Sequence, residues 1–230
     1  MRNDLGSCTG RVIVLYMMCM ILLFSGCGEG ATVADDDGNA APSGKLASSL
    51  SSYIEGFADM PDLSDFQRDI LRRALKSGSV STSDYEQAWS GYKTCMVGKG
   101  YTGLKLIKYS NGMFAEAARS AGTEAQEKKY EQDSGECFDE YISYVDDVYG
   151  VQQGNPNLYE NIEDGFVDCL HRNGLVPRTY SREDYDDEHK RDDGQNDPYS
   201  FDRSNPDVQS CEVANNMLSY RPGDDKEQLW

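Results

Sequence analysis

The sequence predicts a mainly α-helical protein with a small β-hairpin, organised as a tandem helical repeat in which a disulfide staples each copy. Three patterns in its 230 residues support this fold class: cysteines recur at a fixed offset, apolar residues recur at helical spacing behind helix caps, and an Asn-Gly pair lies beside an alternating run. In chain order we expect a signal peptide at 1–26, a flexible tether at 27–45, an N-terminal helical segment at 46–79, repeat units at 80–150 and 151–223, and a tail at 224–230.

The composition restricts the partners of this protein. A formal net charge of -18 and a pI near 4.4 disfavour nucleic acid and anionic lipid surfaces, because like charges repel at close range. Cations, basic peptides and neutral glycans are compatible with this charge. A hydrophobic content of 38% is low but sufficient for a modest core with polar margins.

The N-terminal residues have the layout of a secretory signal. An apolar run of 13 residues, Val12–Phe24, follows the basic residues Arg2 and Arg11. A membrane-spanning helix needs about 20 apolar residues, so this run is too short to remain in a bilayer. We therefore expect it to be cleaved.

The end of the apolar run, FSGC, resembles the lipobox of bacterial lipoproteins. In that family a small residue precedes a cysteine that is linked to diacylglycerol and becomes the first residue after cleavage. Ser25, Gly26 and Cys27 match the pattern, whereas Phe24 stands where the family usually has Leu. The resemblance implies lipid attachment at Cys27 and stable anchoring through two or more acyl chains on the extracytoplasmic face of the cell membrane. A plain secretory signal cleaved near the same place is the alternative.

The segment after Cys27 predicts a tether. Residues 28–45 consist mainly of Gly, Ala, Ser and Asp with a single Pro, and they contain almost nothing to bury. Such a chain lets the folded part stand away from the membrane.

The cysteines predict two disulfides and an internal repeat. Cys8 and Cys19 leave with the signal and Cys27 takes lipid, which leaves an even number of cysteines in an oxidising compartment. These four fall into two pairs separated by 74 residues: Cys95 with Cys169, and Cys137 with Cys211. Of the three possible connectivities, the repeat favours one bridge inside each copy, Cys95 with Cys137 and Cys169 with Cys211. The other two would join the copies to each other.

The same offset aligns other residues around the first cysteine of each copy. Five positions are identical: Tyr85/Tyr159, Glu86/Glu160, Gly91/Gly165, Cys95/Cys169 and Gly100/Gly174. Capping boxes predict that helices begin at Ser83 and Asn157. The buried stripes are expected at Tyr85, Trp89, Tyr92 and Met96 in the first copy, and at Leu158, Ile162, Phe166 and Leu170 in the second.

Glycines mark two special positions in each of these helices. Gly100 and Gly174 are expected to end the helices in the left-handed conformation. Gly91 and Gly165 lie inside the helices, where glycine costs about 1 kcal/mol relative to alanine, so a close approach by another helix is expected there.

Between the helices, the two copies differ. Residues 103–114 of the first copy carry Asn111-Gly112, which predicts a β-hairpin with a type I′ turn. The second copy has Arg182–Asn205 at this place, a stretch expected to be too charged to enter a core. Ahead of both copies, a capped helix is expected after Ser64, with a short helix around residues 53–57 before it.

A broader resemblance covers residues 64–101. Their order of helix, turn, acidic-aromatic helix, Cys-Met pair and Gly-aromatic end is similar to that of actinobacterial secreted lipoproteins of unassigned function, with a weaker echo at 157–175. The resemblance implies export and lipidation and brings no activity with it.

Catalytic motifs are missing from the sequence. It contains no hydrolase elbow, phosphate-binding loop, dinucleotide fingerprint or zinc spacing, and His171 and His189 are its only histidines. The acidic cluster between Asp184 and Asp197 contains hard oxygen ligands suited to calcium, although a solvated loop is the favoured interpretation. Paired carboxylates suited to a glycosidase are expected by chance among 40 acidic residues.

These patterns together predict a membrane-anchored extracytoplasmic lipoprotein that serves as a non-catalytic binding or structural module of the cell envelope. We expect no cofactor, no metal and no nucleic acid, with the membrane as one partner and an envelope protein or glycan as another. The alternatives are a calcium-stabilised adhesive domain and an envelope hydrolase that acts through carboxylates.

Overall fold

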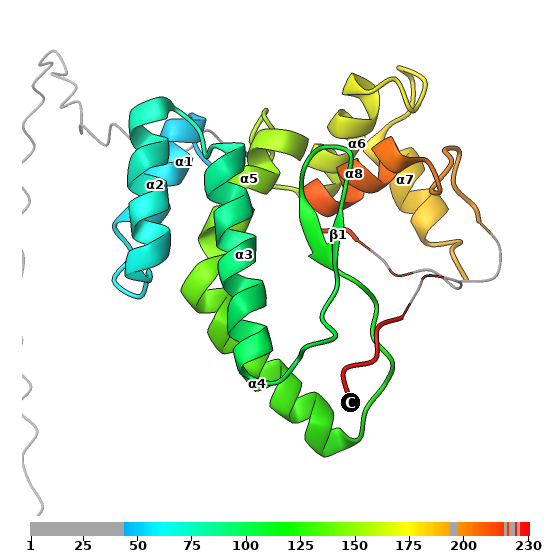
Figure 1. Ribbon diagram of the computed structural model, residues 1–230. Coiled ribbons are helices and arrows are strands. Elements are labelled where there is room, and N and C mark those ends of the chain that lie inside the picture. Colours follow the sequence, from blue (N-terminus) through cyan, green and yellow to red (C-terminus); the bar gives the residue numbers. More distant parts are fainter. Residues whose placement is uncertain (1–43, 194–196, 219, 221–223, 225) are drawn as a thin grey trace, which may run out of the picture. The chain divides into compact units, whose positions relative to one another are not determined.

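A computed structural model describes residues 44–193, 197–218, 220, 224 and 226–230 (Figure 1). The expected signal peptide at 1–26 and the lipid site at Cys27 lie outside the described residues, as does nearly all of the tether. The described helices are α1 (Leu50–Ala58), α2 (Asp65–Ser77), α3 (Thr82–Gly98), α4 (Glu124–Tyr141), α5 (Ser143–Gly154), α6 (Ile162–Arg172), α7 (Arg182–His189) and α8 (Pro206–Ala214). Two strands, β1 (Leu106–Lys108) and β2 (Phe114–Glu116), complete the predicted mainly α-helical fold.

Both predicted disulfides are present, one inside each copy. Cys95 of α3 is bonded to Cys137 of α4, and Cys169 of α6 is bonded to Cys211 of α8. Each bridge spans the same sequence separation of 42 residues, with Cα atoms 5.8 and 5.7 Å apart. The bridges therefore hold corresponding pairs of helices together.

The cysteine helices also end in the same way, as predicted. Gly100 and Gly174 follow α3 and α6 with φ angles of +108° and +67°, which a residue with a Cβ rarely adopts. The N–H of the residue after each glycine donates to a carbonyl five residues earlier, at 3.1 Å in the first copy and 2.9 Å in the second. This is the hydrogen bond of a Schellman motif, and it satisfies a carbonyl that the helix end would otherwise leave without a donor.

The glycines inside the two helices are contacted by the partner helix of the same copy. A Cβ on Gly91 would overlap the ring of Tyr141 at the end of α4. A Cβ on Gly165 would lie 2.7 Å from Oδ1 of Asn215, the residue that follows α8. Asn215 follows Tyr141 by the repeat offset of 74 residues, so both copies use the same close approach.

The two predicted helix starts are wrong. The N-cap of α3 is Ser81, whose hydroxyl accepts from the backbone N–H of Asp84 at 3.1 Å, and not Ser83. The N-cap of α6 is Asn161, four residues beyond the expected Asn157.

The delay before α6 has a local cause. The side chain of Asn155 bonds both the N–H and the carbonyl of Tyr159, at 2.9 and 2.8 Å, and this closes a loop where the helix was expected. Ile162 becomes the first helical residue and is 50% exposed, so it does not belong to the buried stripe. The other stripe residues of both copies are buried.

The strands form the predicted antiparallel hairpin, with Ile107 opposite Ala115. Its turn is not type I′, because Gly112 has a φ of +85° but Asn111 does not have a positive φ. Instead the Asn111 side chain accepts from the N–H of Met113 at 3.1 Å, inside a three-residue loop. The longer loop needs only one left-handed residue.

The described residues contain two hydrophobic clusters. The larger is built from α1 to α5 and the hairpin, and the smaller surrounds the second disulfide with α6, α7 and α8. The prediction that 182–205 cannot enter a core is wrong, because Tyr185 and Phe201 are each only 6% exposed within the smaller cluster. Glu188 can be buried there because the hydroxyl of Tyr180 donates to it at 2.6 Å.

The helical segment before the repeats packs onto the first copy. Ser64 caps α2 as predicted, accepting from the N–H of Gln67 at 3.1 Å. The Gln67 side chain does not complete a capping box. It donates to the carbonyl of Asp139 at 2.7 Å and accepts from the N–H of Tyr144 at 2.9 Å, which fixes α2 to the junction of α4 and α5.

Two features cross the expected segment boundaries. Helix α5 runs through residue 150, where the first copy was expected to end. In the expected tail, Glu227 pairs through its backbone with Ala118 at 2.8 Å and with Ser120 at 3.1 Å, and it is 2% exposed. Within the residues that the structure describes, no helix is long and apolar enough to cross a membrane.

Candidate functional site

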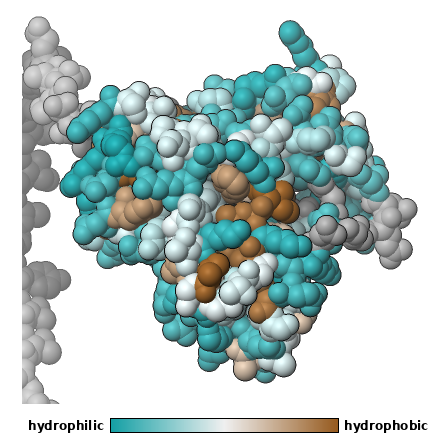
Figure 2. All heavy atoms as spheres, viewed as in Figure 1, coloured by the Kyte–Doolittle hydropathy of each residue, from teal (hydrophilic) through white to brown (hydrophobic). Residues whose placement is uncertain are grey.

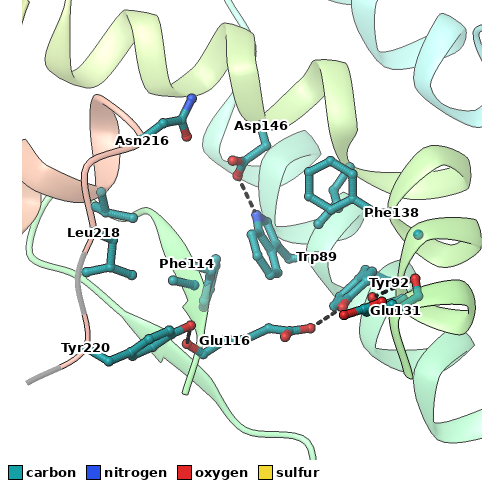
Figure 3. Close-up of a pocket in the computed structure, with 15 residues that line it drawn as sticks. Trp89, Tyr92, Phe114, Glu116, Glu131, Phe138, Asp146, Asn216, Leu218 and Tyr220 are labelled. Atoms are coloured by element: carbon teal, nitrogen blue, oxygen red, sulfur yellow. Dashed lines mark hydrogen bonds between the residues drawn. The ribbon is translucent and has the colours of Figure 1, made fainter. Parts of the chain in front are cut away.

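An open cavity of about 540 Å³ lies between the hairpin, the α3–α4–α5 helices and the chain after α8 (Figure 3). In Figure 2, residues of high hydropathy gather in the middle of the face between α3 and the hairpin, within a largely hydrophilic surround. The described residues that line the cavity are Trp89, Tyr92, Phe114, Ala115, Glu116, Glu131, Ser134, Gly135, Phe138, Ile142, Asp146, Val213, Asn216, Leu218 and Tyr220.

Aromatic side chains form both the buried wall and the exposed rim of this cavity. Trp89 and Tyr92 on α3 are only 6% and 3% exposed, because the helical spacing that makes them core residues also turns them inward. Phe138 on α4 is 40% exposed and Tyr220 is 55% exposed. The cavity is therefore open to solvent at its rim and has a buried aromatic wall.

The first disulfide supports two walls of the cavity at once. Cys95 follows Trp89 and Tyr92 on α3, and Cys137 immediately precedes Phe138 on α4. Fixing the two helices to each other fixes the aromatic side chains that they contribute.

Asp146 on α5 is a carboxylic acid that lines the cavity and is held by two donors. The hydroxyl of Tyr85 and the indole N–H of Trp89 both donate to its Oδ1, at 2.8 and 3.0 Å (Figure 3). Oδ2 takes part in neither bond. Burial raises the pKa of Asp146 to about 6, the two hydrogen bonds oppose this shift, and the charge of Asp147 adds to it.

Two further carboxylates lie toward the other end of the cavity in Figure 3. Glu116 on β2 accepts from the hydroxyls of Tyr92 and Tyr130, the latter at 2.5 Å, and Tyr220 donates to its carbonyl at 3.1 Å. Burial and the neighbouring Glu116 charge raise the pKa of both Tyr92 and Tyr130. These hydroxyls therefore stay protonated and remain donors at physiological pH.

The charges around the cavity are one-sided. Glu116, Glu131 and Asp146 line it, and no Lys, Arg or His is among the described lining residues. The charge of Arg119 interacts with that of Glu116, but Arg119 pairs with Glu127 at 3.0 Å, lies over the ring of Tyr130 and is not among the lining residues. An occupant of this cavity meets negative charge and aromatic faces.

The described residues that the sequence predicted as site residues do not line this cavity. The four disulfide cysteines are brought together as predicted. In the acidic cluster, Asp184 completes the capping box of α7 by accepting from the N–H of Ser181 at 2.8 Å. Asp187 pairs with Lys190 at 3.0 Å, and Asp192 pairs with Arg203 at 3.1 Å. Over the described ranges, no group of three or more His, Cys, Asp or Glu side chains is arranged to hold a metal ion.

The cavity itself was missed at the level of sequence. Trp89 and Tyr92 were predicted as core residues, which they are, but nothing in the pattern indicates that the hairpin leaves space beside them. A signal existed at Asp146, an acid that lies at helical spacing from the apolar residues Ile142 and Tyr149. An acid in such a position must find donors or raise its pKa, and Asp146 does both.

In comparisons with known proteins, no protein-family model, no curated protein and no solved structure matches the chain.

Proposed function

We propose that this protein is an exported lipoprotein, anchored through Cys27, whose folded part is a non-catalytic binding module of the cell envelope. The supporting observations for export are the 13-residue apolar run, the small residues before Cys27 and the resemblance to the bacterial lipobox. Two disulfides suit an oxidising compartment outside the cytoplasm. The partner is an envelope protein, a glycan or a small ligand.

The observation that carries the binding function is the cavity. Its volume of about 540 Å³ lies within the range of small-molecule sites, which is about 300–1,000 Å³. Aromatic walls with a few polar groups are also typical of such sites. Two exposed aromatic residues at its rim, Phe138 and Tyr220, offer area to a ligand at the entrance.

Anchoring is tested by metabolic labelling with a clickable fatty acid, followed by membrane fractionation. The wild-type protein should carry the label and sediment with membranes, and Cys27→Ala should lose both properties. Cys19→Ala, which changes a cysteine inside the apolar run, is the matched control and should behave like the wild type. Unlabelled wild-type protein that still sediments with membranes would rule out the lipid anchor.

Binding in the cavity is tested by filling it. Gly135 lines the cavity from α4, and a Cβ placed on it meets nothing within 4 Å, so Gly135→Trp projects an indole without a clash at its base. Gly56→Trp on α1 is the control, because a Cβ at Gly56 also meets nothing within 4 Å and Gly56 does not line the cavity. A cavity ligand should be excluded only by the first substitution.

One observation favours a second function, that of an envelope hydrolase. Asp146, with a pKa of about 6 and Glu116 and Glu131 in the same cavity, suits a general acid near neutral pH. Release of reducing ends from an envelope polysaccharide by the wild type, and its loss in Asp146→Asn, would favour the hydrolase over a pure binding module.

A further inference from the structure

The charges that line the cavity restrict the class of ligand that can bind there. Neutral glycans are commonly bound by aromatic faces, but they do not require a surplus of negative charge. Three carboxylates line this cavity without a basic side chain among its described lining residues. Such a site disfavours anions strongly and attracts cations.

The positions of the carboxylates add a second restriction. In Figure 3 Asp146 lies at one end of the lined space, Glu116 and Glu131 lie toward the other, and Trp89 lies between them. A single ammonium group can neutralise only one of these ends. Two ammonium groups joined by an apolar chain satisfy both ends and place their methylene groups against the indole and the Phe114 ring.

We propose that the cavity binds a linear aliphatic polyamine, with one ammonium group at Asp146, a second at Glu131 and Glu116, and the intervening methylene groups against Trp89 and Phe114. This inference rests on the proposed binding function and specifies its ligand class. Aromatic faces attract cations and also accept apolar chain, which explains how the same wall serves both parts of the ligand.

Asp146 is equipped for this role by its own contacts. Tyr85 and Trp89 hold Oδ1 at 2.8 and 3.0 Å and fix the carboxylate in position. Oδ2 is not used by either donor, and Asp146 lines the cavity, so an ammonium group can reach the carboxylate without displacing its two donors. A fixed carboxylate binds a cation without first losing side-chain freedom.

The experiment is calorimetric titration of the exported, disulfide-bonded protein with spermidine and with cadaverine. Pentylamine is the matched comparison, because it has the five-carbon chain of cadaverine and only one ammonium group. We expect one binding site, with cadaverine bound about tenfold more tightly than pentylamine because the second charged contact is lost.

Variants separate the cavity from general attraction to an acidic protein. Asp146→Asn should weaken spermidine binding about tenfold and Glu131→Gln about threefold. Asp187→Asn removes the same charge from a side chain that is 75% exposed and outside the cavity, and it should leave affinity unchanged. Gly135→Trp leaves the charge of the protein unchanged and should abolish binding.

A second cavity variant, with a smaller change in volume, keeps the proposal testable if the first one misfolds. If Gly135→Trp is unstable, Tyr220→Ala removes a rim aromatic that is 55% exposed and should weaken binding several-fold. Spermidine affinity that is the same in Asp146→Asn, Asp187→Asn and the cavity variants would overturn the proposal, as would absence of binding. A neutral chitooligosaccharide that binds and is excluded by Gly135→Trp would overturn the polyamine inference while leaving the binding module intact.

Discussion

The two copies of the repeat share the contacts that join their cysteine helices, but they differ in the lengths of these helices and in what lies between them. Each has a disulfide across 42 residues, a glycine-ended cysteine helix and a glycine contacted by the partner helix. In the first copy these fix helices of 17 and 18 residues, and in the second helices of 11 and 9 residues. Among the described residues, the hairpin that forms one side of the cavity belongs to the first copy alone.

The insertions explain the difference. Between its cysteine helices the first copy has a hairpin, and the second has α7, whose Tyr185 belongs to the same small hydrophobic cluster as Cys169 and Cys211. The second copy still contributes to the cavity through Val213 and the residues after α8, such as Leu218. A common stapled pair of helices is therefore the scaffold, and the segment inserted between the cysteines decides whether a cavity results.

Removing each disulfide in turn should have the largest effect on this comparison. Both bridges close loops of the same length, so each should lower the free energy of unfolding by about 4 kcal/mol in the chain-entropy model. The Cys169→Ser, Cys211→Ser variant should lose the second core first, because that cluster is the smaller one. Tryptophan fluorescence reports on the larger cluster, where both Trp89 and Trp230 pack, and hydrogen exchange reports on both copies. Urea melts followed by these two signals should show two separate transitions; one cooperative transition would mean that the copies do not unfold separately.

Asp146 should make the first copy sensitive to pH. Folding raises its pKa from the ordinary 3.8 to about 6, so the folded state binds the proton more tightly. The associated stability is fully present below about pH 4 and is lost as the pH rises through about 6, at a cost of up to about 3 kcal/mol. Asp146→Asn should therefore be more stable than wild type at pH 8 and about equal to it at pH 4.

The surroundings of Asp146 are part of this expectation. Tyr85 on α3 and Asp147 on α5 act on Asp146 directly. Glu131 on α4 and Glu116 on β2 line the same cavity, and a second pocket that Asp146 also lines contains Tyr53, Tyr159 and Glu160. The same substitution should weaken polyamine binding while it stabilises the fold. Denaturant melts at the two pH values measure the first effect, and a variant that is destabilised at pH 8 would contradict the assigned charge state.

Substituting the contacted glycine of each copy should have the smallest effect on the free energy of unfolding, and it tests the same contact in both copies. Gly91→Ala and Gly165→Ala each place a Cβ against the partner helix and should cost about 1–3 kcal/mol. Gly135→Ala, where a Cβ meets nothing within 4 Å, should gain up to about 1 kcal/mol from helix propensity. Thermal melts of the three variants suffice, and a neutral Gly91→Ala would show that the Tyr141 ring moves aside freely.

Short-range patterns explain which structural predictions were confirmed. Three confirmed features depend on residues only a few positions apart: the glycine ends, the hairpin and the buried stripe of Tyr85, Trp89, Tyr92 and Met96. A short segment of sequence therefore contains the pattern that predicts each of them. The start of α6 was wrong because Asn155 closes a loop that competes with the helix, and capping residues alone do not reveal such competition. The burial of residues within 182–205 was not predicted because the many charges of this stretch outweighed Tyr185 and Phe201, which pack in the smaller cluster.

The sequence by itself indicated the repeat and favoured its disulfide pairing over two alternatives, because a spacing of 74 residues between cysteines is a property of the chain alone. Only the tertiary structure decided that a cavity exists and that Asp146 lies in it. A cavity is the space that distant segments leave between them, and here the segments run from Trp89 on α3 to Tyr220 beyond α8. The pKa of Asp146 likewise depends on its burial and on donors 57 and 61 residues away in the chain, which no local pattern records.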